Sequence, residues 1–126
     1  MSGSFRELNG IRIFEVPSEG PELRSGKDAV DLMSDASERR EALIAIPIAR
    51  LADAFFDLRT RIAGEIAQKF ATYGRRVAIV GDISQKTAAS KSLAAFVVES
   101  NRGRDLWFVQ SLDDLAKRLA GDHTGM

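Results

Sequence analysis

The chain has 126 residues, 44% of them hydrophobic and 29% charged, a composition typical of a packed globular domain rather than a disordered segment. Its 18 basic residues balance 18 acidic ones, so no basic excess indicates a nucleic acid or an anionic membrane as a partner. Cysteine is absent, which excludes disulfides, thiolate nucleophiles and cysteine-ligated metal ions.

The sequence carries no pattern of a secreted or membrane protein. Its first residues lack a basic stretch followed by an apolar one, and no apolar run approaches the roughly 18 residues of a membrane span. We therefore expect a single cytoplasmic domain over residues 1–126 that binds neither nucleic acid nor membrane. A net charge of zero does not oppose self-association, so an oligomer is compatible with the sequence.

The first predicted element is a β-hairpin. Asn9-Gly10 is the strongest short pattern for a type I′ turn, and it separates strands predicted over about 5–8 and 11–16. The proline- and glycine-containing segment 17–21 is expected to be a loop.

A helix and a buried strand follow. Ser25, with Asp28 three residues later, predicts the start of a helix over about 26–39. Residues 42–48 form a continuous apolar run of strand length, which indicates a strand covered on both faces. Pro47 lacks an N–H group and is expected at the end of this strand or at a sheet edge.

The longest predicted helix covers about 54–73, with Asp53 as its cap and Gly74 as its stop. A 3.6-residue period predicts one apolar stripe along it, formed by Phe55, Leu58, Ile62, Ile66, Phe70 and Tyr73. A second buried strand is predicted over 75–81.

The last third of the chain predicts a helix over about 87–102, a strand over 105–109 and a helix from Ser111 to about Ala120. The remaining residues, 121–126, are expected to fray. The order ββαβαβαβα predicts an α/β fold with a mostly parallel, mixed sheet of about five strands.

No catalytic motif is present. Glycine-rich nucleotide-binding loops are missing, and the lone histidine, His123, has no partner from which a triad or a metal site could be built. The sequence therefore predicts no catalytic residue, no metal site and no cofactor.

One candidate site comes from position alone. Ligands of parallel sheets bind at the carboxyl ends of the strands, where the turn containing Asp82 is expected. Helical spacing places Arg59 within the apolar stripe, so we expect an Arg59–Asp82 ion pair at this edge, with Thr60 and Ser84 nearby. The pair has two interpretations: it satisfies a buried charge, or it holds an anionic ligand.

A second set of residues is a candidate interface. Glu65 and Lys69 are spaced for an i,i+4 ion pair on a helix face that also carries Gln68. In each of the adjacent aromatic pairs, Phe55-Phe56 and Trp107-Phe108, we expect one ring in the core and the other available for a contact surface. The residues predicted to be available for contacts are Phe56, Glu65, Gln68, Lys69, Asn101 and Arg102.

Four segments resemble the signature of a bacterial family, domain-of-unknown-function family 4180. They are Phe55–Thr60, Ala63–Phe70, Ala78–Asp82 and Glu99–Gly103, and the resemblance covers nearly the whole chain. The family has no established activity, so the resemblance implies membership without a function.

The predicted topology is also similar to the STAS fold of anti-sigma-factor antagonists. That resemblance implies a small cytoplasmic interaction module switched by phosphorylation of a Ser or Thr at the start of the second helix. Here the segment Asp57–Thr60 replaces the Asp-Ser-Ser/Thr-Gly turn of those proteins, and Thr60 is its only hydroxyl. The similarity therefore concerns the fold, and the phosphoswitch is in doubt.

Two functions remain open at this point. The first is a non-enzymatic, STAS-like regulatory or protein-interaction module, with a protein partner or self-association. The alternative is a small anionic-ligand-binding protein or enzyme with its site at the carboxyl edge of the sheet.

Overall fold

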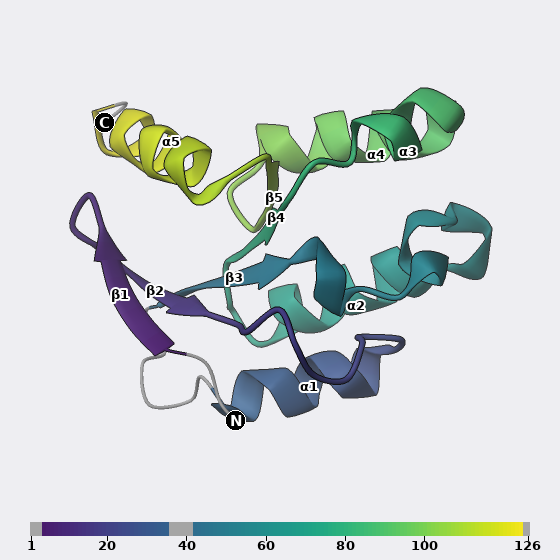
Figure 1. Ribbon diagram of the computed structural model, residues 1–126, viewed down its shortest axis with the longest axis horizontal. Coiled ribbons are helices and arrows are strands. Elements are labelled where there is room, and N and C mark those ends of the chain that lie inside the picture. The colour runs from purple at the N-terminus through teal and green to yellow at the C-terminus, as the bar shows by residue number, and fades with distance from the viewer. Residues whose placement is uncertain (1–3, 36–41, 125–126) are drawn as a thin grey trace.

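A computed structural model describes residues 4–35 and 42–124, which form a five-stranded sheet with helices against both faces (Figure 1). The strands are β1 (Ser4–Leu8), β2 (Ile11–Glu15), β3 (Leu43–Pro47), β4 (Val77–Val80) and β5 (Leu106–Val109). The helices are α1 (Gly26–Asp35), α2 (Ile62–Thr72), α3 (Ser84–Ala89), α4 (Lys91–Arg102) and α5 (Leu112–Thr124). The predicted α/β class is confirmed.

The strands lie in the sheet in their chain order. β1 and β2 are antiparallel, and β2, β3, β4 and β5 are parallel to one another. Asn9 and Gly10 have φ angles of 50° and 82°, which confirms the predicted turn of the β1–β2 hairpin. Pro47 is the last residue of β3, as expected for a residue that cannot donate to the next strand.

The two faces of the sheet hold separate cores. Helices α1, α2 and α4 cover the first face, whose buried side chains include Phe14, Ile44, Ile46, Phe55, Val77, Ile79 and Phe108. Helix α5 covers the second face, where Leu115 and Leu119 meet Ile13, Leu43, Ala78 and Trp107. Burial on both faces explains why the central strands are apolar without alternation.

Two polar contacts of helix α5 add to its packing on that second face. Near its middle, the carbonyl of Ala116 accepts a hydrogen bond from the side-chain amide of Asn9, and Figure 1 shows α5 beside the hairpin turn. The guanidinium groups of Arg76 and Arg118 lie 4.8 Å and 4.2 Å from the ring centre of Trp107. The helix ends at Thr124, four residues beyond the predicted end.

The predicted helix over 54–73 is wrong in its first part. Three 3₁₀ turns, η1 (Ile48–Arg50), η2 (Asp53–Phe56) and η3 (Leu58–Thr60), lead from β3 to α2. The side chain of Asp57 accepts a hydrogen bond from the Arg59 N–H and so caps η3 instead of continuing a helix. Arg61, with φ of 67°, then separates η3 from α2. Gly74, with φ of 67°, is the expected stop at the other end.

The predicted helix over 87–102 is two helices. Ser90 has extended angles, φ of −141° and ψ of 111°, and its hydroxyl accepts the N–H of Leu93 at 3.1 Å. A serine in this role is a strong N-cap, so it begins α4 and ends α3. Helix α1 begins as predicted, with the Asp28 N–H bonded to the Ser25 hydroxyl, and the predicted end at about 39 lies outside the described residues.

No helix in the described part of the chain is long and apolar enough to cross a membrane.

Candidate functional site

The carboxyl ends of β3, β4 and β5 lie at one edge of the sheet, because these three strands are parallel. The turns that follow them contain the four residues proposed as a ligand site, Arg59, Thr60, Asp82 and Ser84. The structure shows how each of their polar groups is engaged.

Arg59 pairs with Asp57, and the predicted Arg59–Asp82 ion pair is wrong. The Nη2 and Nε atoms of Arg59 lie 2.9 Å and 3.0 Å from the two carboxylate oxygens of Asp57. The Arg59 side chain is 90% exposed, so it does not lie on the core face. The prediction fails because η2 and η3 shift the helical phase before α2 begins.

The Arg59–Asp57 pair is a bidentate contact on the surface. The hydrogen bond from the Arg59 side chain holds the pKa of Asp57 below its usual value, and the Arg59 N–H adds to this effect. The same side-chain bond raises the pKa of Arg59. Both groups are therefore charged and paired with each other, which leaves Arg59 poorly suited to hold a ligand.

Asp82 forms the turn into α3. Its carboxylate accepts the Ser84 N–H at 2.9 Å, and this backbone bond is the main cause of a lowered pKa. Hydrogen bonds from the side chains of Ser84 and Gln110 lower the pKa further. The carboxylate is therefore ionised at neutral pH, and a negative group at this place repels an anionic ligand.

A small pocket of about 220 Å³ opens beside this turn. It is lined by Gly81, Asp82, Ile83, Ser84, Thr87, Val97, Phe108, Val109 and Gln110. Gly81 has φ of 148°, and a Cβ there would lie 2.7 Å from a side-chain atom of Ile48. This pocket is the place that sequence reasoning predicted, yet it brings together only Asp82 and Ser84 of the four residues.

Thr60 also has a local structural role. Its hydroxyl oxygen lies 2.7 Å from the carbonyl oxygens of Ala54 and Asp57. The same oxygen accepts the Ile62 N–H at 3.3 Å, at the first residue of α2. The hydroxyl thus joins η2, η3 and α2.

The family described as Domain of unknown function (DUF4180) matches residues 8–119, which contain all of the strands from β2 to β5 and the turns between them. The chain belongs to this family. No curated protein and no solved structure matches the chain. The family description assigns no activity to this DUF4180 domain.

A wider groove of about 780 Å³, which we call the α2–α4 groove, lies between the start of α2 and the middle of α4. Its lining consists of Leu58, Thr60, Arg61, Gly64, Glu65, Gln68 and Phe96. Below it, the ring of Phe96 packs edge-on against Phe108 with centroids 6.1 Å apart, and Phe108 contacts Phe55 in turn. The groove therefore has the ring of Phe96, backed by two core aromatics, on one side and polar residues of η3 and α2 on the other.

Two polar side chains of this groove have no partner within the described chain. The structure records no hydrogen bond or ion pair for the side chains of Arg61 and Gln68 in the ranges that it describes. Arg61 also keeps a left-handed backbone, which costs a non-glycine residue about 1 kcal/mol. The side chain of Arg61 itself makes no capping hydrogen bond to α2 within the described residues.

The predicted interface residues separate into three groups. Gln68 and Glu65 line the groove, while the stems of Glu65 and Lys69 pack over Gly26 of α1, about 3 Å from where a Cβ would lie. The structure records no Glu65–Lys69 ion pair within the residues that it describes, which corrects that prediction. Phe56 is buried against Phe55, so it is not a contact surface.

Asn101 and Arg102 act within the fold. The side chain of Asn101 makes two hydrogen bonds with the backbone of Phe108. Its Oδ1 accepts the Phe108 N–H at 2.7 Å, and its Nδ2 donates to the Phe108 carbonyl at 3.3 Å. Arg102 pairs with Glu99 on the exposed face of α4, 3.0 Å away. Neither residue lines the α2–α4 groove, so neither is part of the candidate site.

The candidate site of this DUF4180 domain is therefore the α2–α4 groove. Among the described residues, no group of three or more His, Cys, Asp or Glu side chains could hold a metal ion. The sequence analysis named Thr60, Glu65 and Gln68 and missed Arg61, Gly64 and Phe96. Asp and Thr are residue types that often cap helices, and they occur at Asp53, Asp57 and Thr60. This pattern could have indicated that the helix begins after residue 60 and not at about 54.

Proposed function

We propose that this DUF4180 domain is a non-enzymatic, STAS-like protein-interaction module that binds a segment of a partner protein in the α2–α4 groove. One observation carries the proposal. At the carboxyl edge, Arg59, Thr60 and Asp82 are engaged in local hydrogen bonds, whereas Arg61 and Gln68 in the groove are without partners among the described residues.

The lining of the groove defines the chemistry of the partner segment. Leu58 and Phe96 supply apolar surface for one or two apolar side chains. The guanidinium of Arg61 suits a carboxylate, with which it can form two parallel hydrogen bonds. Gln68 offers an amide to the backbone of an extended segment. An acidic, partly apolar segment fits this pattern.

The element order supports the STAS-like part of the proposal. A hairpin followed by alternating helices and parallel strands is the order of that fold, and STAS domains are cytoplasmic interaction modules. A phosphoswitch is not part of the proposal, because the Thr60 hydroxyl is engaged with the Ala54 and Asp57 carbonyls. A cytoplasmic location remains a prediction from the sequence.

The alternative, a small anionic ligand at the carboxyl edge, has less support. Its two proposed charged groups do not meet, since Arg59 binds Asp57. The remaining charge in the pocket is the ionised carboxylate of Asp82, which has the wrong sign for an anion.

The proposal is tested by placing a photo-crosslinking amino acid at position 68, inside the groove. The cross-linked protein is identified by mass spectrometry, purified, and titrated with the unmodified chain. We expect the charge reversal Arg61→Glu to weaken binding by about tenfold or more. Lys117→Glu, a reversal at an exposed site on α5, is the matched control and should bind as the wild type does.

Three outcomes would contradict the proposal. The cross-link at position 68 fails to form with any protein, it forms only with a second copy of this chain, or both reversals weaken the purified complex equally. Light scattering on the pure chain separates the second outcome from the others by giving the oligomeric state.

A further inference from the structure

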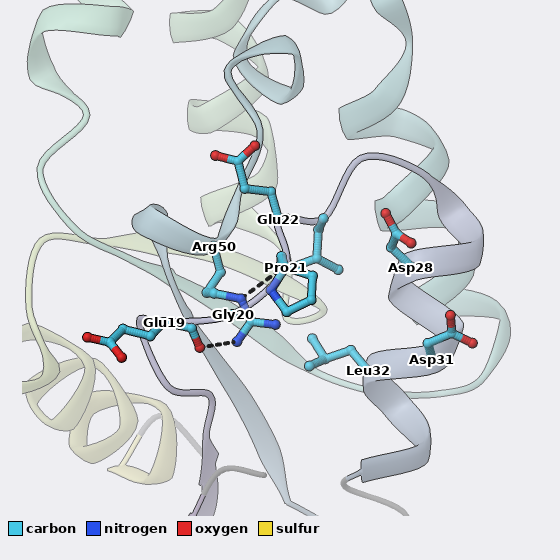
Figure 2. Close-up of a pocket in the computed structure, with 9 residues that line it drawn as sticks. Glu19, Gly20, Pro21, Glu22, Asp28, Asp31, Leu32 and Arg50 are labelled. Carbon is cyan, nitrogen blue, oxygen red and sulfur yellow. Dashed lines mark hydrogen bonds between the residues drawn. The ribbon is translucent and has the colours of Figure 1, made fainter. Parts of the chain in front are cut away.

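A second cavity, which we call the α1 pocket, lies between the loop before α1 and the side of that helix (Figure 2). Its volume is about 440 Å³, within the range of small-molecule sites. It is lined by Glu19, Gly20, Pro21, Glu22, Leu23, Asp28, Asp31, Leu32 and Arg50. It shares no lining residue with the α2–α4 groove.

Arg50 forms one wall of the α1 pocket and is fixed by neutral groups. Its Nε donates to the Pro21 carbonyl at 2.7 Å, and its Nη1 donates to the carbonyls of Pro17 at 2.9 Å and Glu19 at 3.4 Å. The guanidinium also lies flat against Gly20, where a Cβ would be 2.9 Å from its central carbon. The cation is held in place before any ligand binds.

The charge of Arg50 is not neutralised by this arrangement. All three acceptors are carbonyls, and no ion pair of Arg50 is recorded within the described residues. Its Nη2 makes no hydrogen bond in that part of the chain and keeps two N–H donors. Nη2 can therefore still donate to a carboxylate oxygen, while Nε and Nη1 are engaged with the loop carbonyls.

The opposite wall is formed by α1 and is acidic. Figure 2 shows Asp28 and Asp31 along this wall, with the side chain of Leu32 facing Arg50 across the pocket. One oxygen of Asp28 accepts the Arg24 N–H at 2.9 Å, which leaves the other oxygen available. Asp31 lies 3.4 Å from Lys27 and is 64% exposed. The buried side chains of Leu23 and Leu32 give the pocket apolar surface between the two walls.

We propose that the α1 pocket binds a free, zwitterionic α-amino acid with an aliphatic side chain. The ligand carboxylate accepts hydrogen bonds from Nη2 of Arg50, the ammonium group faces Asp28 and Asp31, and the side chain contacts Leu32. The lining holds the carboxylates of Glu19, Glu22, Asp28 and Asp31 against the one guanidinium of Arg50, so it repels a simple anion. A simple cation would leave the Arg50 guanidinium without a counter-ion. A molecule with both charges satisfies both walls. This site is independent of the proposed function of the α2–α4 groove.

Isothermal titration calorimetry of the full chain with L-leucine tests the proposal. We expect a dissociation constant of about 1 mM or tighter. N-acetyl-L-leucine, which lacks the cation, and L-leucinamide, which lacks the carboxylate, should each bind at least about tenfold more weakly. Asp31→Asn should weaken L-leucine about tenfold, because it removes one charge from the α1 wall.

The control is Glu99→Gln, which removes an exposed carboxylate on α4 and should leave the affinity unchanged. Arg50→Ala would also release the loop that contains Pro17, Glu19 and Pro21. It is therefore compared with Arg50→Lys, and thermal unfolding first shows which of the two variants is folded. Absence of L-leucine binding, equal binding of either blocked derivative, or equal effects of Asp31→Asn and Glu99→Gln would overturn the proposal. Arg61→Glu changes the α2–α4 groove and not the α1 pocket, so this variant should still bind L-leucine. That measurement separates the test of the pocket from the test of the groove.

Discussion

Asn101 takes the place of a neighbouring strand along Phe108. Its Oδ1 accepts the Phe108 N–H at 2.7 Å, and its Nδ2 donates to the Phe108 carbonyl at 3.3 Å. β5 is the last strand of the sheet, so these two backbone groups point away from β4 and would otherwise lack a protein partner. A side chain of α4 thereby occupies the two backbone groups of Phe108 with which another strand could pair.

Replacing Asn101 by Ala should therefore destabilise the protein by about 1–3 kcal/mol, the cost of leaving partly buried backbone groups without partners. Urea denaturation followed by fluorescence of the single tryptophan, Trp107, measures this change. Arg102→Ala, next in the sequence but in an exposed ion pair, is the control and should change stability by less than about 1 kcal/mol. Equal effects of the two substitutions would contradict the role of Asn101.

Gly81→Ala should be more costly than Gly10→Ala. Gly81 has φ of 148° and lacks space, because a Cβ would lie 2.7 Å from Ile48. Backbone strain and overpacking together are expected to cost roughly 2–5 kcal/mol. Gly10 has φ of 82° with nothing within 4 Å of its Cβ position, so it carries only strain of about 1 kcal/mol. Urea midpoints of the two variants that agree within error would refute this prediction.

Arg61→Gly should stabilise the fold while weakening partner binding. Glycine adopts the φ of 67° without the steric cost that arginine bears there, which predicts a gain of up to about 1 kcal/mol. The same change removes from the α2–α4 groove a guanidinium that has no partner among the described residues. Thermal unfolding and titration with the purified partner measure the two effects. Arg61→Lys keeps the strain and the charge, so a gain in stability for this control would show that strain is not the cause.

Asp82 predicts a specific dependence of stability on pH. Its folded-state pKa is lowered mainly by the hydrogen bond from the Ser84 N–H, so it lies below the unfolded value of about 3.9. The stabilisation is complete above that unfolded value and is lost as the pH falls through the folded pKa. The difference in unfolding free energy between wild type and Asp82→Ala should be largest near neutral pH.

Urea titrations at about pH 7 and about pH 3 test this expectation, because the difference should shrink at the lower value. Asp82→Asn is the matched control, since an amide oxygen can accept the Ser84 N–H without titrating. A wild-type advantage over Asp82→Ala that is constant across this range would exclude the proposed cause.

The fold was predictable because its strands and turns are local patterns. The Asn9-Gly10 turn and the apolar run ending at Pro47 occupy the predicted places. Ser90 shows where such reasoning fails, since a capping hydroxyl inside an apolar-periodic stretch divides it into two helices. The spacing of apolar residues predicts which side chains share a face of a helix, but it does not predict the residue at which the helix begins.

The candidate site was less predictable for the same reason. Arg59 was placed on the core face by counting from residue 54, and η2, η3 and the left-handed Arg61 each change that phase. Arg61 became a candidate only in the folded chain, because a lack of partners is a property of three-dimensional contacts. The fixed position of Arg50 likewise depends on carbonyls some 30 residues earlier, including Pro21, 29 residues away.

The bond from Asn9 to Ala116 joins the first turn of the chain to its last helix, across 107 residues. Asn9 is synthesised 107 residues before Ala116, so this contact forms only after that part of α5 has been made. Before α5 is in place, Ile13 and Trp107 lack the helix that covers them from solvent. This face of the sheet is therefore exposed to water until α5 docks, and the packing of Leu115 and Leu119 covers it.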